Sequence, residues 1–373
     1  MYNIAFIGGG INSAIGRTHK ISCNIDNKFV LKAGAFSRNP DINRKTGEEF
    51  GVAPEHVYDD YKEMLEKEKD NIDVIAVLTP TDSHEKIVVD AIKAGYPVVC
   101  EKSLATSVEE GLNIYDMVSE KKAFFCVTYN YTGYPVIRLL RNKIRSGEFG
   151  KIIKIIAEMP QEGFNRYTSD NKIPNPQKWR LSDYDIPTIS LDLGTHLHNM
   201  IYFLTEQSPI EVVSQENTYG FFSDIVDDIS CIVKYTSDMS VQMWYSKAAL
   251  GHRNGLRIRI YGSEKSAEWY QLEPEYLKIC DNHGNMTIMD RSNDSQIGVD
   301  ERYNRFKVGH PAGFIEAFGN YYSDIYDMLR AYKNNEEYKS EYICPLDISV
   351  EGLRLFSKAH ESHINNEWKK IFE

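Results

Sequence analysis

The sequence has no apolar run that approaches the roughly 20 residues of a membrane-spanning helix, so we expect no membrane span. Its first residues lack a basic segment followed by a long apolar one, and we expect no secretory signal peptide. An excess of positive charge is also missing: the net charge is −11, which argues against general affinity for nucleic acid or anionic membranes. We therefore expect neither nucleic-acid nor membrane partners.

Cysteine is sparse, with six in 373 residues, and no two are spaced as C-x-x-C. This spacing indicates neither a disulfide framework nor a zinc site. Scattered thiols in a chain of this length are typical of the reducing cytoplasm, where we expect the protein to lie. Internal repeats and low-complexity segments are absent as well. With 42% hydrophobic residues, the chain can build a sizeable core, and its length predicts about two domains.

The first part of the chain alternates short apolar runs with helical segments. We expect strands at residues 3–7, 31–36, 57–60, 72–78, 98–102 and 124–129, each followed by a helix. Such β-α alternation predicts an α/β Rossmann domain with a doubly wound parallel sheet. We place this domain at residues 1–147, because the glycines at Gly147 and Gly150 suggest a boundary.

The pattern changes after this boundary. Strands are expected at 152–159, 212–217, 229–235, 241–245 and 257–261, with one helix early on, at 189–204. Strands that follow each other without helices predict an α+β domain, residues 148–373, with a largely antiparallel open sheet. Residues 281–309 are interpreted as a long excursion, and 311–332 and 346–363 as closing helices. The C-terminal helix can pack back on the first domain.

The first strand runs into Gly8-Gly9-Gly10-Ile11-Asn12-Ser13, a G-x-G-x-x-S pattern. In dinucleotide-binding folds the first glycine allows a tight turn and the second lets the pyrophosphate approach the backbone. Ser13 stands where a third glycine permits close helix packing, and serine is small enough for that role. The N-terminus of the following helix would face the phosphates. The turn therefore predicts a dinucleotide site.

An acidic residue is missing at the end of the second strand, where it would hold the adenosine ribose hydroxyls. Ser37 and Arg38 stand there instead. A serine and an arginine would accept a 2′-phosphate, which predicts tolerance of NADP. Alternatively, Arg38 only stacks on the adenine or faces solvent, so the cofactor is NAD or NADP.

The apolar run Val98-Val99-Cys100 ends in Glu101 and Lys102. Ligands of open α/β sheets bind at the carboxyl ends of such strands, and a lysine there can hold a hydroxyl or carbonyl oxygen. Taken alone, these residues favour a solvated Glu-Lys pair without function, and only the flanking segments favour a site.

Taken together, these stretches resemble the Gfo/Idh/MocA oxidoreductases, the family of glucose-fructose oxidoreductase and inositol dehydrogenase. The resemblance covers nearly the whole chain. It rests on the glycine turn, Thr79-Pro80 with His84, Glu101-Lys102, Trp179-Arg180, Leu191-Asp192-Leu193-Gly194-Thr195-His196, Gly309-His310-Pro311-Ala312-Gly313-Phe314 and Glu316-Ala317-Phe318. It implies an NAD(P)-dependent dehydrogenase or reductase of a sugar, polyol or inositol-like compound, assembled as a homodimer or homotetramer.

The sequence departs from the family pattern at three places. Ser103 follows Glu101-Lys102 where the family usually has proline, which leaves the loop less rigid. The acid after the second strand is missing. Pro187-Thr188-Ile189-Ser190 replaces the glycines that often precede the second-domain aspartate, which would reshape the substrate pocket.

Asp192 and His196 are four residues apart, hence on one face of a helix. A carboxylate beside an imidazole can hold its tautomer and raise its basicity, as alcohol oxidation requires. Lys102 can bind the same hydroxyl oxygen and stabilise negative charge. The resemblance implies that these three catalytic candidates line the cleft between nicotinamide and substrate; otherwise Asp192 and His196 are an ordinary helix-face pair.

The remaining candidates follow from position and resemblance. The cofactor-binding set is Gly8, Gly10, Ile11, Asn12, Ser37, Arg38, Thr79, Pro80, His84, Glu101 and Lys102. The substrate-binding set is Lys102, Tyr131, Trp179, Arg180, Asp192 and His196. We expect no metal, since the spacing of His196 and His198 does not converge on a helix; His198 is interpreted as structural and His19 as non-catalytic. Alternative functions are a nucleotide-sugar dehydrogenase and a non-catalytic dinucleotide-binding regulator.

Overall fold

The computed structural model describes residues 1–294 and 297–372, in two compact units. Unit 1 contains Met1–Ala105, Glu109–Gly133 and Gly313–Val350, and unit 2 contains Thr106–Val108, Tyr134–Ala312 and the chain from Glu351 on. The chain therefore passes into unit 2 before residue 147, where the sequence suggested a boundary, and it returns to unit 1 for Gly313–Val350, which hold one complete helix and the first residues of the next. Among the described residues, no helix is long and apolar enough to cross a membrane.

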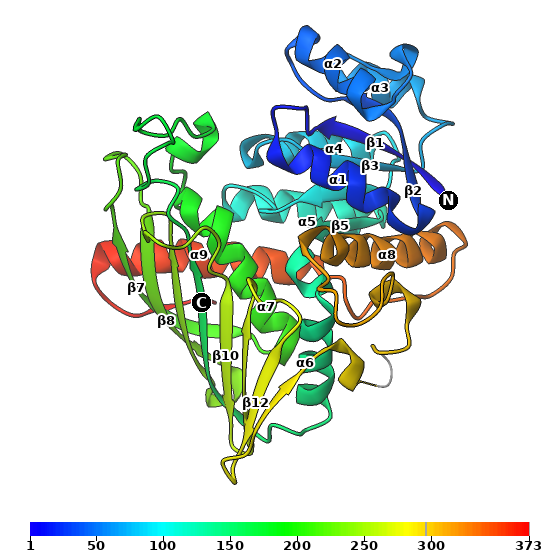
Figure 1. Cartoon of the computed structure of the whole chain (residues 1–373). Coiled ribbons are helices and arrows are strands. Elements are labelled where there is room, and N and C mark those ends of the chain that lie inside the picture. Colours follow the sequence, from blue (N-terminus) through cyan, green and yellow to red (C-terminus); the bar gives the residue numbers. More distant parts are fainter. Residues whose placement is uncertain (295–296, 373) are drawn as a thin grey trace. The chain divides into compact units, whose positions relative to one another are not determined.

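Unit 1 is built on a five-stranded parallel sheet with the order β2-β1-β3-β4-β5 (Figure 1). The strands are β1 (Tyr2–Gly8), β2 (Phe29–Ala35), β3 (Val74–Leu78), β4 (Val98–Glu101) and β5 (Phe125–Thr128). The predicted strand at 57–60 is wrong: Val57 makes only an isolated bridge with Gly34. A 3-10 turn at Pro54–His56 precedes it and Asp60 caps the next helix, so too few residues remain for a strand.

The helices of the N-terminal part follow the predicted pattern. They are α1 (Ala14–Asn24), α2 (Pro40–Phe50), α3 (Tyr61–Lys67), α4 (His84–Lys93) and α5 (Val108–Lys121). Local capping sets both ends of α2: the Asn39 side chain accepts hydrogen bonds from two backbone N–H groups of the first turn, and Gly51 ends the helix at φ 74°.

Helix α8 (Phe314–Lys333) belongs to unit 1 because its aromatic face packs against α1. The rings of Phe318 and Tyr322 both contact the His19 ring. Gly319 lies against Ile25, and a Cβ there would come within 2.9 Å of the isoleucine side chain. Tyr321 donates a hydrogen bond to the Val127 carbonyl at 2.7 Å. A late segment thus completes the core of the first unit.

Unit 2 is built on a nine-stranded sheet with the order β13-β12-β11-β10-β6-β9-β8-β7-β14. Only β6 and β9 pair in parallel; the other neighbours are antiparallel. The strands are β6 (Ile152–Pro160), β7 (Pro209–Asn217), β8 (Asp228–Tyr235), β9 (Ser240–Ser246), β10 (Arg257–Gly262), β11 (Lys265–Tyr270), β12 (Leu277–Asp281), β13 (Met286–Met289) and β14 (Lys369–Lys370). The five strands predicted for this domain are present, and β11 to β14 are additional.

Helices cover one face of this sheet. They are α6 (Pro135–Arg145), α7 (Thr195–Thr205) and the part of α9 (Leu346–Asn365) that belongs to unit 2. Helix α7 lies against β6 and α6, and α9 is tied to β7 by a hydrogen bond of 3.1 Å from the Ser214 N–H to the Ser362 hydroxyl.

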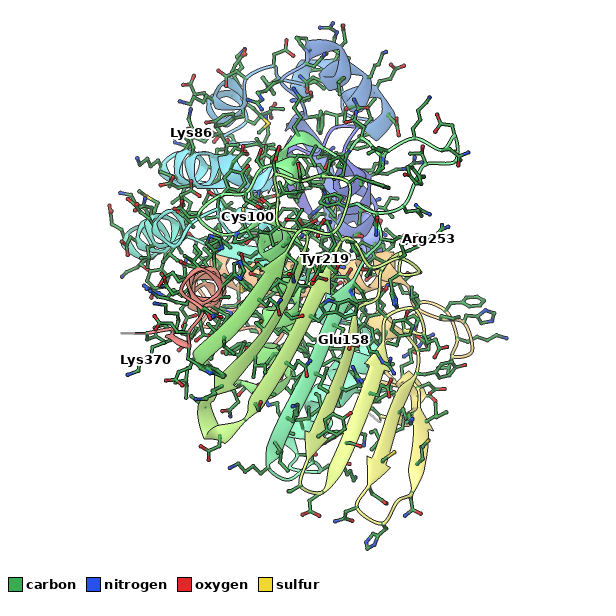
Figure 2. The ribbon with its side chains drawn as sticks, turned by 90° about the vertical axis from the view of Figure 1, so that its left-hand side faces the viewer. Lys86, Cys100, Glu158, Tyr219, Arg253 and Lys370 are labelled. Carbon is green, nitrogen blue, oxygen red and sulfur yellow. The ribbon has the colours of Figure 1, made fainter. Side chains whose placement is uncertain are left out.

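The other face of the sheet carries alternate side chains of each strand and points toward the viewer in Figure 2, where Glu158 is labelled. Polar pairs such as Arg259 and Glu158, 2.6 Å apart, alternate there with exposed apolar side chains. Ile232 is 47% exposed and Ile288 65% exposed. The strand pattern therefore leaves a broad, partly apolar face outside the core of unit 2.

Candidate active site

The turn after β1 has no room for side chains. Gly8 has φ 85°, and a Cβ on it would lie 2.8 Å from the backbone of Leu78 and Thr79. A Cβ on Gly10 would lie 3.1 Å from the Phe36 carbonyl oxygen. The Ile11 N–H donates to the Thr46 hydroxyl at 3.1 Å, which ties the turn to α2. This is the backbone geometry that a pyrophosphate needs for close approach.

The close helix packing expected at Ser13 is provided by Gly16 instead. Ser13 is the N-cap residue of α1, whereas a Cβ on Gly16 would lie 1.7 Å from the Gly9 carbonyl oxygen. The sequence signal that could have indicated this contact is Gly16 itself, which lies about one helical turn after Ser13.

Ser37 and Arg38 follow β2, as expected. The Ser37 hydroxyl accepts a hydrogen bond from the Asn39 N–H at 3.1 Å. Arg38 is exposed, and within the described part of the chain its side chain has no hydrogen bond or ion pair. Its guanidinium group is therefore available to solvent or to a ligand.

His84 begins α4 and joins the ends of two neighbouring strands. Its Nδ1 lies 2.8 Å from the Ser103 carbonyl oxygen and its Nε2 lies 2.9 Å from that of Thr79. The ring is fully buried, and burial lowers its pKa. The neutral ring can donate to one of these carbonyls at a time, so His84 lies between the two loops, and its part in cofactor binding stays a prediction.

Glu101 ends β4 and is buried. Its Oε1 accepts hydrogen bonds from His19 Nε2, at 2.9 Å, and from the Thr128 hydroxyl. Burial opposes ionisation of this carboxyl, but the hydrogen bond and charge of His19, the charge of Lys102 and the Thr128 hydrogen bond hold its pKa below the usual value. The Lys102–Ser103 peptide bond is cis, although residue 103 is not proline.

Two residues after β5 also lie in unit 1. Asn130 is 5% exposed, and its Nδ2 has no hydrogen-bond partner among residues 1–294 and 297–372. The Tyr131 ring, a substrate candidate, is buried and packs edge-on against Phe314 at 5.8 Å between centroids. An unsatisfied buried amide at the carboxyl end of a strand is a position where a ligand can supply the missing acceptor.

In unit 2, Asp192 lies on a π-helical turn. The predicted helix at 189–204 begins with the π-helix Ser190–Gly194, in which the Thr195 N–H bonds to the Ser190 carbonyl, and continues as α7. Gly194 lets this turn pack closely, since a Cβ there would lie 2.8 Å from the Phe356 ring. Such turns occur frequently at functional sites.

Asp192 is buried, and two cations meet at its Oδ2 atom. Arg180 Nη1 lies 2.6 Å away and Lys247 Nζ lies 2.7 Å away. Arg180 also stacks on the Trp179 ring at 4.5 Å. The structure therefore brings together Asp192 with the predicted substrate residues Trp179 and Arg180, and it adds Lys247, which the sequence analysis did not identify. His196, at the start of α7, is 7% exposed.

His198 points into the core of unit 2. Its Nε2 lies 3.2 Å from Glu351 Oε1, and a Cβ on Gly352 would lie 3.0 Å from its Nδ1. This placement fits the structural role expected for His198. Among residues 1–294 and 297–372, no group of three or more histidine, cysteine, aspartate or glutamate side chains is arranged to hold a metal ion.

A parallel sheet whose first turn excludes side chains, with Glu101 ending its fourth strand and Lys102 directly after it, has the architecture of a dinucleotide-binding Rossmann domain. Two family models match the chain: the NAD-binding Rossmann fold of the oxidoreductase family at residues 2–129, and the GFO/IDH/MocA C-terminal domain at residues 137–268. The chain belongs to the Gfo/Idh/MocA family of oxidoreductases.

Individual relatives cover most of the chain. An uncharacterized oxidoreductase of Bacillus subtilis, YfiI, is 29% identical over 94% of this chain and 91% of its own length. Levoglucosan dehydrogenase of Pseudarthrobacter phenanthrenivorans is 24% identical over 74% of this chain and 76% of its own. A solved structure of an inositol dehydrogenase homolog from Azotobacter vinelandii, complexed with NADH and myo-inositol, is 26% identical with a TM-score of 0.88, covering 99% of this chain and 97% of that one.

Proposed function

We propose that the protein transfers a hydride between a nicotinamide cofactor and a hydroxyl or carbonyl carbon of a sugar, polyol or inositol-like substrate. The observation that carries this proposal is the Glu101-Lys102 pair at the carboxyl end of β4, in a parallel sheet whose first turn is built of glycines that leave no room for side chains. Ligands of open α/β sheets bind at this edge.

The residues of unit 1 fit the cofactor. Gly8 and Gly10 keep the backbone of the turn packed against Leu78, Thr79 and Phe36, where a Cβ would collide, and the Asn130 Nδ2, which has no hydrogen-bond partner among the described residues, offers a donor for a polar group. The residues proposed to hold the cofactor are Gly8, Gly10, Ile11, Asn12, Ser37, Arg38, Thr79, Pro80, Glu101 and Lys102, with His84 between the surrounding loops. When bound, the nicotinamide accepts or donates the hydride.

Three side chains carry the rest of the chemistry in this proposal. Lys102 binds the reacting oxygen and stabilises the negative charge that develops on it. His196 takes the hydroxyl proton as a general base. Asp192 is proposed to hold the imidazole in the tautomer that this step needs. Trp179, Arg180 and Tyr131 are proposed to contact the substrate.

The names of the relatives support a polyhydroxylated ring as the substrate. One relative is a levoglucosan dehydrogenase, and a structural neighbour was solved with myo-inositol. Both compounds present several hydroxyl groups in fixed positions, which a site with lysine, arginine, histidine and aspartate side chains can recognise by hydrogen bonds.

The test is a thermal-shift panel of NAD, NADP, free sugars, inositols and nucleotide-sugars, followed by cofactor-reduction assays with every compound that stabilises the protein. We expect stabilisation by a dinucleotide and turnover with a sugar or inositol. Turnover only with nucleotide-sugars would favour a nucleotide-sugar dehydrogenase, and dinucleotide binding without any turnover would favour a regulator.

The cofactor site has its own control. Gly10→Asp would press a charged side chain against the Phe36 carbonyl oxygen, which lies 3.1 Å from a Cβ at this position, and the displaced turn should abolish the dinucleotide shift. Gly163→Asp is the matched substitution, because a Cβ on Gly163 meets no atom within 4 Å, and it should leave the shift unchanged. Unchanged affinity in Gly10→Asp would remove the site from this turn.

A further inference from the structure

Lys247 lies directly after β9 and is almost completely buried, with a side chain only 5% exposed. Burying an ammonium group is costly unless it is paired. Its backbone is held from two sides: its N–H donates to the Asp227 carbonyl and its own carbonyl accepts from the Phe164 N–H, both at 2.8 Å. The fold therefore fixes the point from which this side chain extends.

The ammonium group of Lys247 and the guanidinium group of Arg180 contact the same oxygen of Asp192, at 2.7 Å and 2.6 Å. Arg180 alone would balance the single charge of the carboxylate. Lys247 thus adds a second fixed donor that simple ion pairing does not require. Two donors that approach one oxygen from different segments restrict the rotation of the carboxylate group.

A chain of side-chain amides also contacts the ammonium group. Gln161 Oε1 accepts from Lys247 Nζ at 3.4 Å, while Gln161 Nε2 donates to Asn254 Oδ1 at 3.1 Å. Asn254 Nδ2 in turn donates to Gln271 Oε1 at 3.0 Å. Each amide turns its oxygen toward the cation, so their dipoles align in favour of the positive charge. Aligned hydrogen bonds of this kind orient groups more precisely than apolar packing would.

We propose that Lys247 is a positioning residue of the hydride-transfer reaction that acts through Asp192. The inference rests on the proposed function and extends it. The ammonium group holds the Asp192 carboxylate in one orientation, as a fixed anion, while charge develops on the reacting groups. Charges that are already in place need no reorganisation during the reaction, which is why such preorganisation accelerates it.

The test replaces the ammonium group and then restores a positive charge. Lys247→Met keeps the length of the side chain, and we expect kcat to fall about 10–100-fold, as misplacement of a reacting group does. The KM values for cofactor and substrate should change little, and Lys247→Arg should recover most of the lost kcat. Lys234→Met is the control: Lys234 is 57% exposed and pairs with Glu211 on the open face of the sheet, so its loss should not affect kcat.

A double substitution shows whether Lys247 acts through Asp192. In an Asp192→Asn background, Lys247→Met should cost less than about twofold in kcat, because residues that act as a unit do not contribute separately. A full additional loss in that background would overturn the proposal. So would wild-type kcat in Lys247→Met, or a folded Lys247→Met variant whose defect arginine does not relieve.

A misfolded variant and a failure of the proposed function can both be distinguished from a failure of this inference. Lys247→Met is used only if its circular dichroism spectrum matches that of the wild type. If it does not match, Gln161→Met replaces it, because Gln161 belongs to the chain of amides that contacts Lys247. Gln161→Met should lower kcat several-fold, and wild-type kcat in this variant would refute the proposal. A wild-type protein without turnover on any compound of the panel would overturn the proposed function together with this inference. An active wild type with unaffected variants would overturn the inference alone.

Discussion

His19 Nε2 lies 2.9 Å from Glu101 Oε1, and both side chains are buried in unit 1. The Tyr322 hydroxyl, 2.6 Å from His19 Nδ1, holds the other side of the imidazole ring. This pair joins α1, which begins at the glycine turn, to the end of β4, where Lys102 follows. It thus connects the two parts of unit 1 that we propose to contact the cofactor.

The His19–Glu101 pair predicts a pH-dependent contribution to stability. Because the pKa of Glu101 is lowered in the folded protein, its contribution is present above the pKa of the unfolded chain and is lost as the pH falls through the folded value. Glu101→Gln should lower the free energy of unfolding at pH 7 by about 1–3 kcal/mol. The difference from wild type should shrink below about pH 4.5.

Urea unfolding of both proteins between pH 3 and pH 7 would measure this difference. Glu55→Gln, at an exposed position, is the control and should follow wild type throughout. A Glu101→Gln deficit that does not change with pH would mean that ionisation of this carboxyl does not stabilise the fold.

The second prediction concerns cofactor choice. Since an acidic residue is missing after β2 and Arg38 is exposed, NADP should be accepted at least as well as NAD. Arg38→Ala should lower kcat/KM for NADP about tenfold, the effect of about one charge-assisted hydrogen bond, and leave the value for NAD nearly unchanged. A strong preference of the wild type for NAD, untouched by the substitution, would refute the idea.

The catalytic assignment predicts a graded series. Lys102→Ala and His196→Ala should each lower kcat about 10²–10⁴-fold, the usual range for general acid–base groups, with little change in cofactor affinity. Asp192→Asn should cost less, because the imidazole group stays in place. The combined losses should be smaller than the product of the single ones.

His198 provides the control for this series. Its contact with Glu351 and its closeness to Gly352 predict that His198→Gln lowers the melting temperature but retains most of kcat. An inactive His198→Gln protein with a wild-type fold, beside an active His196→Ala protein, would show that the wrong histidine was assigned.

The open face of the sheet in unit 2 predicts self-association into a homodimer or homotetramer. Large apolar side chains on this face are at least 40% exposed: Ile232, Tyr261, Met286 and Ile288. Apolar surface of this extent rarely remains in contact with water. Light scattering at micromolar concentration should give a mass above one chain. Ile232→Glu should reduce that mass, and Leu272→Glu, in a turn, should not; a monomeric wild type would contradict the prediction.

The sequence predicted most clearly those features that depend on neighbouring residues. Asn39 and Gly51 determine where α2 begins and ends, and both act on backbone groups within one helical turn. The strands β11 to β13 were not predicted. Residues such as Lys265 and Glu268 interrupt their apolar runs, and these strands are stabilised by their pairing with each other.

Parts of the candidate site depend on contacts between distant residues. His19 and Tyr322 are separated by 303 positions, and no local pattern indicates that they meet. The same is true of Lys247 and Asp192, whose ion pair forms only when the end of β9 reaches the π-helical turn. The catalytic candidates could be named because they resemble a family motif; the groups that hold them in place could not.

The π-helical turn at Ser190–Gly194 also affects how this chain is aligned with its relatives. A turn closed by a hydrogen bond over five residues holds one residue more than an α-helical turn. Against a relative whose helix begins with an ordinary turn, the chain carries a one-residue insertion at this point. The stretch from Asp192 to His196 nevertheless resembles the family motif without a gap, so a relative that aligns here without an insertion is expected to carry the same wide turn.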